Sequence, residues 1–298
     1  DVRPSEAVPG VVASWKPASF PATGTGMQGF GVAVNAPLYA ALIAREVAAN
    51  RMASTCTSSE TLTGATLALS ADCQPTLSTA EYAALMTGKI NTANALLGTT
   101  GDTKTITLNR RVKTSGTQAA AEAFFAGRSM YNAKTPAADG YLDVLGGDAA
   151  TPVVTGDLTV KTWSTTDNVR DGIKGETTNY SLGVISLDKG FDLLTANSLK
   201  GGLWVKLEGV SPMLSKNVAG ATVVDKKAKV GFAQGYPFVY EAQAIKSAKL
   251  SGAYLDIFNK IVGTDGLTNT SVDLAGVLAK SVAPFTRGDS NFYPLTKY

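Results

Sequence analysis

The chain has 298 residues and a mass of 30.8 kDa, which is enough for about two domains with a buried core of ordinary size. Lys and Arg number 27 against 24 Asp and Glu, so the net charge is only +3, and the basic residues are scattered. We therefore expect no nucleic-acid partner, because such a partner requires a clustered basic face. Histidine is absent, which excludes histidine-based acid–base catalysis and histidine-ligated metal sites.

The N-terminal part of the sequence predicts a connector, a strand and a helix. Residues 1–26 are rich in Pro and Gly, which is typical of a connector. The chain begins at Asp1 without a Met or an export signal, so we expect a processed or truncated product. The apolar run Phe30–Asn35 predicts a buried strand, and the spacing of apolar residues over Pro37–Asn50 predicts a helix.

Two cysteines, Cys56 and Cys73, follow that helix in a stretch rich in Ser, Thr and Ala. Two thiols cannot complete a four-cysteine zinc or iron–sulfur site. One interpretation is a disulfide that closes a small hairpin, stabilises the fold by about 3 kcal/mol and indicates an oxidising compartment. The alternative is a pair of buried free thiols in a cytosolic protein. No apolar run approaches the roughly 18 residues that span a bilayer.

The central part of the sequence predicts a strand that leads through a turn into a helix. Before it, Ser78–Glu81 has the pattern of a capping box, which predicts a helix that ends at Gly88. Thr105–Arg111 alternates apolar and polar residues, as a strand does. A turn over Lys113–Gly116 follows, and Thr117–Phe125 has strong helix propensity.

The same patterns predict further strands and helices downstream. Strands are expected over Val153–Val160, Tyr180–Leu187, Leu203–Leu207 and Gly235–Ala242, and helices over Asn168–Ile173, Leu250–Val262 and Val272–Val282. Alternating strands and helices predict an α/β protein whose sheets are at least partly parallel.

The junction from Arg111 to Thr117 is the strongest candidate for a functional site. The first N–H groups of a helix have no partner within the helix, and the helix dipole places partial positive charge there, so this end can hold an anion. Ser115 and Thr117 would add hydroxyl donors, Gly116 would let the backbone approach closely, and Arg111 could bind an oxyanion through two N–H groups. The alternative is that Ser115 or Thr114 caps the helix and Arg111 is an ordinary surface residue.

Two other motif matches are interpreted as accidental. Gly24–Gly29 matches G-x-G-x-x-G, but it follows a Pro-rich segment and precedes a strand, whereas a dinucleotide fingerprint follows a strand and opens a helix. Ser186–Lys189 matches S-x-x-K without an accompanying K-T-G or S-D-N. We therefore expect no enzyme.

Several segments together resemble the phosphate-binding substrate-binding proteins of ABC importers, which are type II periplasmic binding proteins. Arg111–Thr117 is similar to the family's R-x-x-x-S-G-T anion loop, and Asp1–Pro4 resembles the segment whose Asp accepts a hydrogen bond from the anion. Between Arg111 and Ser115 the family often has an acidic residue and a Gly, where this chain has Lys113 and Thr114. Gln28–Asn35 also resembles the family's strand that crosses into the second lobe, and Leu77–Ile90 resembles one of its helices. Two more strands of the family resemble Leu182–Ile185 and Tyr236–Phe238.

The resemblance implies an α/β, two-lobed type II periplasmic-binding-protein fold with mixed sheets, in which the first lobe is incomplete at the N-terminus. Residues 1–33 and 231–298 would form lobe 1, and residues 34–230 would form lobe 2 with the anion loop.

The resemblance also implies a periplasmic or secreted protein that holds phosphate or a related oxyanion for an ABC transporter permease, without a cofactor or a metal. The implied ligands are Asp1, Arg111, Ser115, Gly116 and Thr117. An ionised Asp1 would favour a protonated anion such as HPO₄²⁻ over sulfate. The alternative is a structural subunit of an extracellular filament or surface assembly that has lost ligand binding and self-assembles through the incomplete lobe.

Overall fold

The computed structural model describes residues 22–56, 73–126, 144–146, 151–187, 203–212, 215–218, 221–224, 236–247, 249–262, 282–283, 285–286 and 296–297. Its helices are α1 (Ala36–Ala48), α2 (Thr79–Met86), α3 (Ala93–Leu97), α4 (Gly116–Phe125), α5 (Thr166–Gly175) and α7 (Gly252–Val262). Its longer strands are β1 (Ala22–Val34), β3 (Ile106–Arg111), β4 (Val153–Thr155), β5 (Leu158–Trp163), β6 (Tyr180–Ser186), β9 (Ser215–Val218), β10 (Ala221–Val224) and β11 (Val239–Ile245). Two-residue strands are β2 (Thr76–Leu77), β7 (Leu203–Trp204), β8 (Lys206–Leu207), β12 (Val282–Ala283), β13 (Phe285–Thr286) and β14 (Thr296–Lys297).

The main sheet is mixed, with the strand order β11-β1-β6-β3-β5-β4. Strand β3 runs parallel to both β5 and β6, whereas β1 is antiparallel to β6 and β4 is antiparallel to β5. This pattern confirms the predicted α/β class with mixed sheets.

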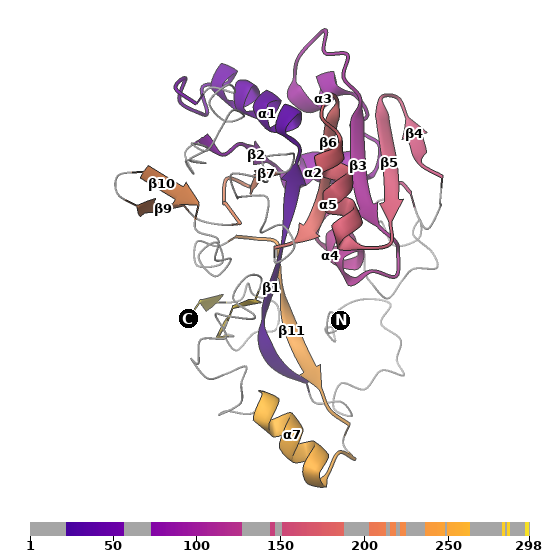
Figure 1. Ribbon diagram of the computed structural model, residues 1–298, viewed down its shortest axis with the longest axis vertical. Helices are drawn as coiled ribbons and strands as arrows, with labels where there is room; N and C mark the ends of the chain where they lie inside the picture. The colour runs from indigo at the N-terminus through magenta and orange to yellow at the C-terminus, as the bar shows by residue number, and fades with distance from the viewer. Residues whose placement is uncertain are drawn as a thin grey trace.

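Strand β1 joins two parts of this sheet (Figure 1). Its first part, Ala22–Gly29, pairs with β11, and its second part, Phe30–Val34, pairs with β6. The predicted connector over residues 1–26 is therefore wrong for the last five of them, because pairing with β11 overrides the local Gly-rich composition. The Gly24–Gly29 match lies inside this strand, so it does not form a strand-to-helix turn.

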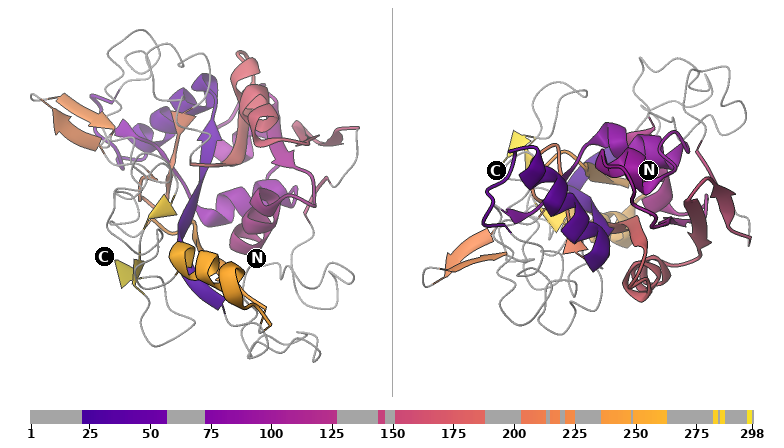
Figure 2. Two further views of the ribbon diagram at one scale, coloured as in Figure 1. Left: turned by 60° about the horizontal axis from the view of Figure 1, so that its bottom comes forward. Right: turned by 90° about the horizontal axis from the view of Figure 1, so that it is seen from above.

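Helices cover both faces of the sheet (Figure 2). On one face, Leu108 and Val184 line a small pocket together with residues of α2 and α4. On the other face, the space beside Gly183 is filled by Asn109 and by Val169 of α5. Adjacent strand residues thus alternate between the two helical layers, as the pleat of a sheet requires.

Two of the predicted strand and helix ranges need correction, and a third lies almost wholly outside the described residues. The single strand expected over Val153–Val160 is a hairpin, β4 and β5, that turns at Gly156, where φ is +57°. The strand expected over Leu203–Leu207 is divided between β7, which pairs with β1, and β8, which pairs with β2. The helix expected over Val272–Val282 lies almost wholly outside the described residues, and its last residue belongs to β12.

The two cysteines form a disulfide, which confirms the first interpretation of this pair and rules out free thiols. Cys56 follows α1 and Cys73 precedes β2, so the bond links the end of that helix to the start of the strand. The hairpin expected between them lies outside the described residues.

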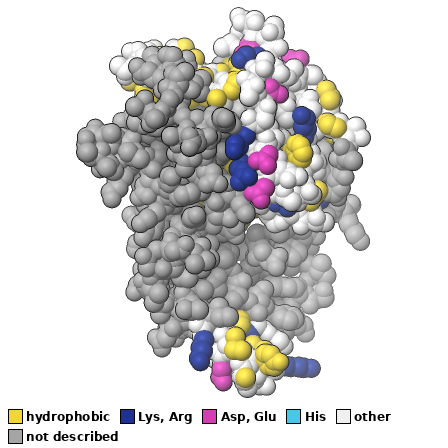
Figure 3. All heavy atoms as spheres, in the orientation of Figure 1, with side chains coloured by type: hydrophobic (Ala, Val, Ile, Leu, Met, Phe, Trp, Pro, Cys, Tyr) yellow, Lys and Arg dark blue, Asp and Glu magenta, His cyan; other side chains and the backbone are white. Residues whose placement is uncertain are grey.

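Helix α7 lies at one end of the molecule, beside the lower end of β11 (Figure 1), and hydrophobic side chains gather on the surface at that end (Figure 3). It exposes apolar side chains, with Tyr254 75% and Ile257 56% accessible. Among the described residues, no helix is long and apolar enough to cross a bilayer.

Candidate functional site

The candidate site lies where β3 ends and α4 begins. The backbone turns after Arg111 through a hydrogen bond from Ser115 N–H to the Val112 carbonyl (3.0 Å). Buried Gln118 fixes this turn, because its Oε1 accepts from Arg111 N–H (3.2 Å) and its Nε2 donates to Glu122 Oε1 (3.0 Å). The first turn of α4 is thus held against the end of a buried strand.

Helix α4 has no side-chain cap. Ser115 is buried and has the extended backbone of an N-cap residue, but its side chain makes no capping hydrogen bond. Among the described residues, the N–H groups of Gly116 and Thr117 have no hydrogen-bond partner. Side-chain oxygens do cap α1, α2, α3 and α5, from Asn35, Ser78, Thr92 and Thr165. Ser115 is therefore the N-cap residue of α4 by its backbone, as the alternative interpretation has it, but no side-chain hydrogen bond caps the helix.

The Arg111 side chain is held at the neighbouring junction between β5 and α5. Its Nη1 donates to Thr166 Oγ1 (2.5 Å) and its Nη2 donates to the Ser164 carbonyl (2.9 Å). Nε is buried and has no partner in the described part of the chain. Burial lowers the pKa of the Arg111 guanidinium. The side chain is therefore half-buried and ordered by contacts, unlike the surface residue of the alternative interpretation.

The space next to α4 differs between its two sides. Thr117 and Gln118 line a pocket of about 10 Å³ with Tyr82 and Val184, which is room for about one water molecule and too small for a tetrahedral oxyanion. Gly116, in contrast, is exposed, and a Cβ at this position would meet nothing within 4 Å. Among the described residues, the space over Gly116 is therefore open to an anion that approaches the amides.

Three of the predicted site residues, Ser115, Gly116 and Thr117, lie at the start of α4. The backbone N–H of Arg111 bonds to Gln118 in the same turn, whereas the Arg111 guanidinium is held at the start of α5. Asp1 lies outside the described residues.

Sequence reasoning missed Ser164 and Thr166, which hold the guanidinium. They come next to Arg111 because β3 and β5 pair with Arg111 opposite Trp163. No local motif signals that pairing; only the prediction of a parallel sheet could have suggested it.

The later part of α4 packs against the start of β11 and the chain that leads into it. Tyr240 donates a hydrogen bond to the Ala120 carbonyl (3.0 Å), and Phe124 stacks on Phe238 with ring centroids 4.4 Å apart. Phe238 also contacts Phe30 of β1 (5.3 Å between centroids), at the position where β1 changes partners. The candidate site thus belongs to a helix that contacts the connection between the two parts of the sheet.

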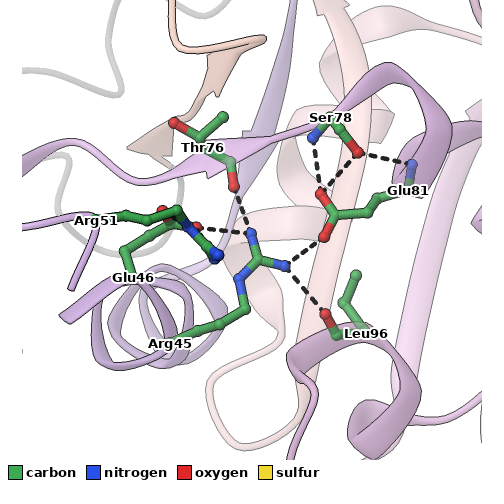
Figure 4. Close-up of polar contacts among 7 residues, drawn as sticks. All are labelled: Arg45, Glu46, Arg51, Thr76, Ser78, Glu81 and Leu96. Carbon is green, nitrogen blue, oxygen red and sulfur yellow. Dashed lines mark hydrogen bonds and ion pairs between the residues drawn. The ribbon is translucent and has the colours of Figure 1, made fainter. Parts of the chain in front are cut away.

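A second polar cluster lies between α1, α2 and α3 (Figure 4). Arg45 donates to Glu46, to Glu81 and to the carbonyls of Thr76 and Leu96. Because the two carboxylates neutralise the arginine and its Nη donors are used, this cluster has a structural role. In the described parts of the chain, no group of three or more Cys, Asp or Glu residues could hold a metal ion.

No protein-family model matches the sequence, and no curated protein matches it. Solved structures do match. An ABC-type phosphate transport receptor from Vibrio cholerae matches with a TM-score of 0.50 and 11% identity, over 92% of this chain and 77% of that chain. The ancestral soluble variant of the human phosphate binding protein has a TM-score of 0.45 and 14% identity, over 91% and 71% of the two chains. A possible phosphate binding protein from Planctomyces limnophilus has a TM-score of 0.44 and 12% identity, over 88% and 68%.

The likeness to the Vibrio cholerae receptor confirms the predicted fold, which is that of type II periplasmic binding proteins.

Proposed function

We propose that this protein is an extracytoplasmic solute-binding protein that holds phosphate or a similar oxyanion for an ABC importer. The observation that carries this proposal is the uncapped N-terminus of α4 next to the half-buried Arg111. The fold, shared with a phosphate transport receptor, supports it.

The proposed ligands are all hydrogen-bond donors. The amides of Gly116 and Thr117 carry the partial positive charge of the helix end, and the hydroxyls of Ser115 and Thr117 can donate as well. Arg111 has five N–H groups, of which two are used by Thr166 and Ser164. A tetrahedral anion bound over Gly116 would satisfy groups that are otherwise left without partners.

The proposed site lies between two lobes, formed by residues 1–33 with 231–298 and by residues 34–230. The change of partner along β1 between Gly29 and Phe30 supports this division, because the strand passes there from β11 to β6. Asp1 would add an acceptor from lobe 1, which would favour a protonated anion over sulfate.

The remaining parts of the proposal concern location and partners. The Cys56–Cys73 disulfide supports a periplasmic or secreted location, since such bonds persist in oxidising compartments. The proposed partner is the permease of an ABC transporter.

Isothermal titration calorimetry of the full chain with inorganic phosphate and with sulfate tests the proposal, using Gly116→Ala as the decisive variant. The added methyl meets no protein atom within 4 Å, so the fold should keep its melting temperature, while the methyl occupies the space through which the anion reaches the amides. We expect phosphate affinity to fall by about tenfold or more.

The matched control is Gly175→Ala, another helical glycine with nothing within 4 Å of its added Cβ, at the far end of α5. It should bind phosphate as the wild type does. The absence of heat with either anion in the wild-type chain, or equal binding by Gly116→Ala and wild type, would defeat the proposal.

A further inference from the structure

Arg111 is oriented by neutral groups, whereas its neighbour Arg110 is paired with a carboxylate. Arg110 Nη2 lies 3.1 Å from Glu122 Oε1, and both side chains are mostly buried. Arg111 instead uses the Thr166 hydroxyl and the Ser164 carbonyl. Among the described residues, no carboxylate lies within 4.0 Å of its guanidinium. The positive charge of Arg111 is therefore not cancelled by the groups that hold it.

The groups that hold Arg111 are themselves fixed. Thr166 is the first residue of α5, whose N-terminus is capped by a hydrogen bond from Asn168 N–H to Thr165 Oγ1 (3.1 Å). Trp163, the residue before Ser164, lies opposite Arg111 in the parallel pairing of β3 with β5. The two acceptors, the Ser164 carbonyl and Thr166 Oγ1, thus lie just after the end of β5 and in the first turn of α5. Their fixed positions set the direction of the Arg111 guanidinium.

The environment of this guanidinium favours a negatively charged ligand. It lies at the N-terminus of α5, where the helix dipole adds positive partial charge that is unfavourable for a cation. Its Nε–H is buried without a partner in the described part of the chain, which costs free energy until an acceptor arrives. An anion with two negative charges would offset both costs.

We propose that Thr166, together with the Ser164 carbonyl, is a positioning residue that aims Arg111 at a doubly charged tetrahedral oxyanion, HPO₄²⁻ or sulfate, while leaving the arginine charge uncompensated. This inference rests on the proposed function. Thr166 Oγ1 accepts from Arg111, so the hydroxyl proton of Thr166 can also donate to the same anion.

The test compares Thr166→Val with Thr166→Ser in the full chain, by calorimetric titration with inorganic phosphate and with sulfate. Valine keeps the shape but removes the acceptor, and we expect affinity to fall by about tenfold, as for the loss of one hydrogen bond to a charged group. Serine keeps the hydroxyl and should restore affinity to within about twofold of wild type. Melting temperatures are measured for both variants. If Thr166 had a merely structural role, Thr166→Val would lower the melting temperature, but phosphate affinity would not fall in Thr166→Val and recover in Thr166→Ser.

A third variant, Thr166→Asp, tests the uncompensated charge. A carboxylate in the first turn of α5 suits the helix dipole, so stability should not fall. Affinity for both anions should fall by about tenfold or more, because the carboxylate would neutralise Arg111 and repel the anion. Wild-type affinity in Thr166→Asp or in Thr166→Val would overturn this inference alone. Failure of the wild-type chain to bind either anion would overturn the proposed function, and this inference with it.

Discussion

Glu46 is the residue with the densest set of charged contacts in the polar cluster of Figure 4. Its Oε1 lies 3.0 Å from Arg45 Nη2, and its Oε2 lies 2.8 Å from Arg51 Nε. Burial alone would raise the pKa of the Glu46 carboxyl, but the hydrogen bonds and charges of Arg51 and Arg45 outweigh burial and hold the pKa below its ordinary value of 4.5. The folded state therefore favours the ionised carboxylate more than the unfolded state does.

We expect Glu46→Gln to lower the free energy of unfolding by about 1–3 kcal/mol at pH 7, because hydrogen bonds to charged partners are lost. A carboxyl whose pKa is lowered on folding stabilises the protein above its unfolded pKa, and this contribution disappears as the pH falls through the folded-state pKa. The difference between wild type and variant should therefore narrow below pH 4.5, the ordinary pKa of this group. Urea unfolding of both proteins at a series of pH values measures this difference in the free energy of unfolding.

Asp256→Asn provides the control for the Glu46 variant, since Asp256 is an exposed carboxylate on α7. It should leave the free energy of unfolding within about 0.5 kcal/mol of wild type. A Glu46→Gln penalty that stays constant down to pH 3 would show that lost packing, and not the ion pairs, sets the stability at this position.

At the scale of elements, the disulfide fixes the end of α1 to the start of β2. Strand β2 has only two residues and pairs in parallel with β8, another two-residue strand, so few backbone hydrogen bonds hold it. A cross-link between Cys56 and Cys73 restricts the unfolded chain and so offsets this weak pairing.

The double variant Cys56→Ala/Cys73→Ala should lose about 3 kcal/mol of unfolding free energy, the value for a closed loop of this length. Urea unfolding followed by circular dichroism measures this loss, and wild type treated with a thiol reductant should lose a similar amount. An unchanged urea midpoint in both samples would mean that the bond closes a loop that is already ordered in the unfolded state.

Elements with a complete local signal were predicted well from the sequence. The capping box at Ser78 and Glu81 forms as expected, with both of its reciprocal hydrogen bonds, at the start of α2. Helix α4 begins at Gly116, one residue before the range that propensity indicated. In these segments the local preferences and the tertiary packing agree, which is why local patterns suffice.

Features that depend on a distant partner and have no local signal of their own were not predicted. The first half of β1 looks like a connector, and its extended form comes from pairing with β11, more than 200 positions away in sequence. The candidate site divides in the same way. Ser115, Gly116 and Thr117 belong to one local motif, whereas Thr166 reaches Arg111 only through strand pairing.

At the scale of the whole molecule, β1 and the chain around β11 form the connection between the two parts of the sheet (Figure 1). Helix α4 contacts this connection through Tyr240 and Phe238. If the two parts are the lobes of a solute-binding protein, anion binding at the start of α4 is coupled to the relative orientation of the lobes through these contacts. Self-assembly through the incomplete lobe stays a prediction, which light scattering of the purified full chain can test.

The most direct measurement is the amide proton–nitrogen correlation spectrum of the full chain during titration with inorganic phosphate. If the first turn of α4 binds the anion, the amide signals of Gly116 and Thr117 shift downfield and saturate, because their N–H groups gain an acceptor. The Gly175 amide, at the other end of α5, should stay unchanged. Saturable shifts elsewhere in the spectrum, with Gly116 and Thr117 unmoved, would contradict an anion site at this helix.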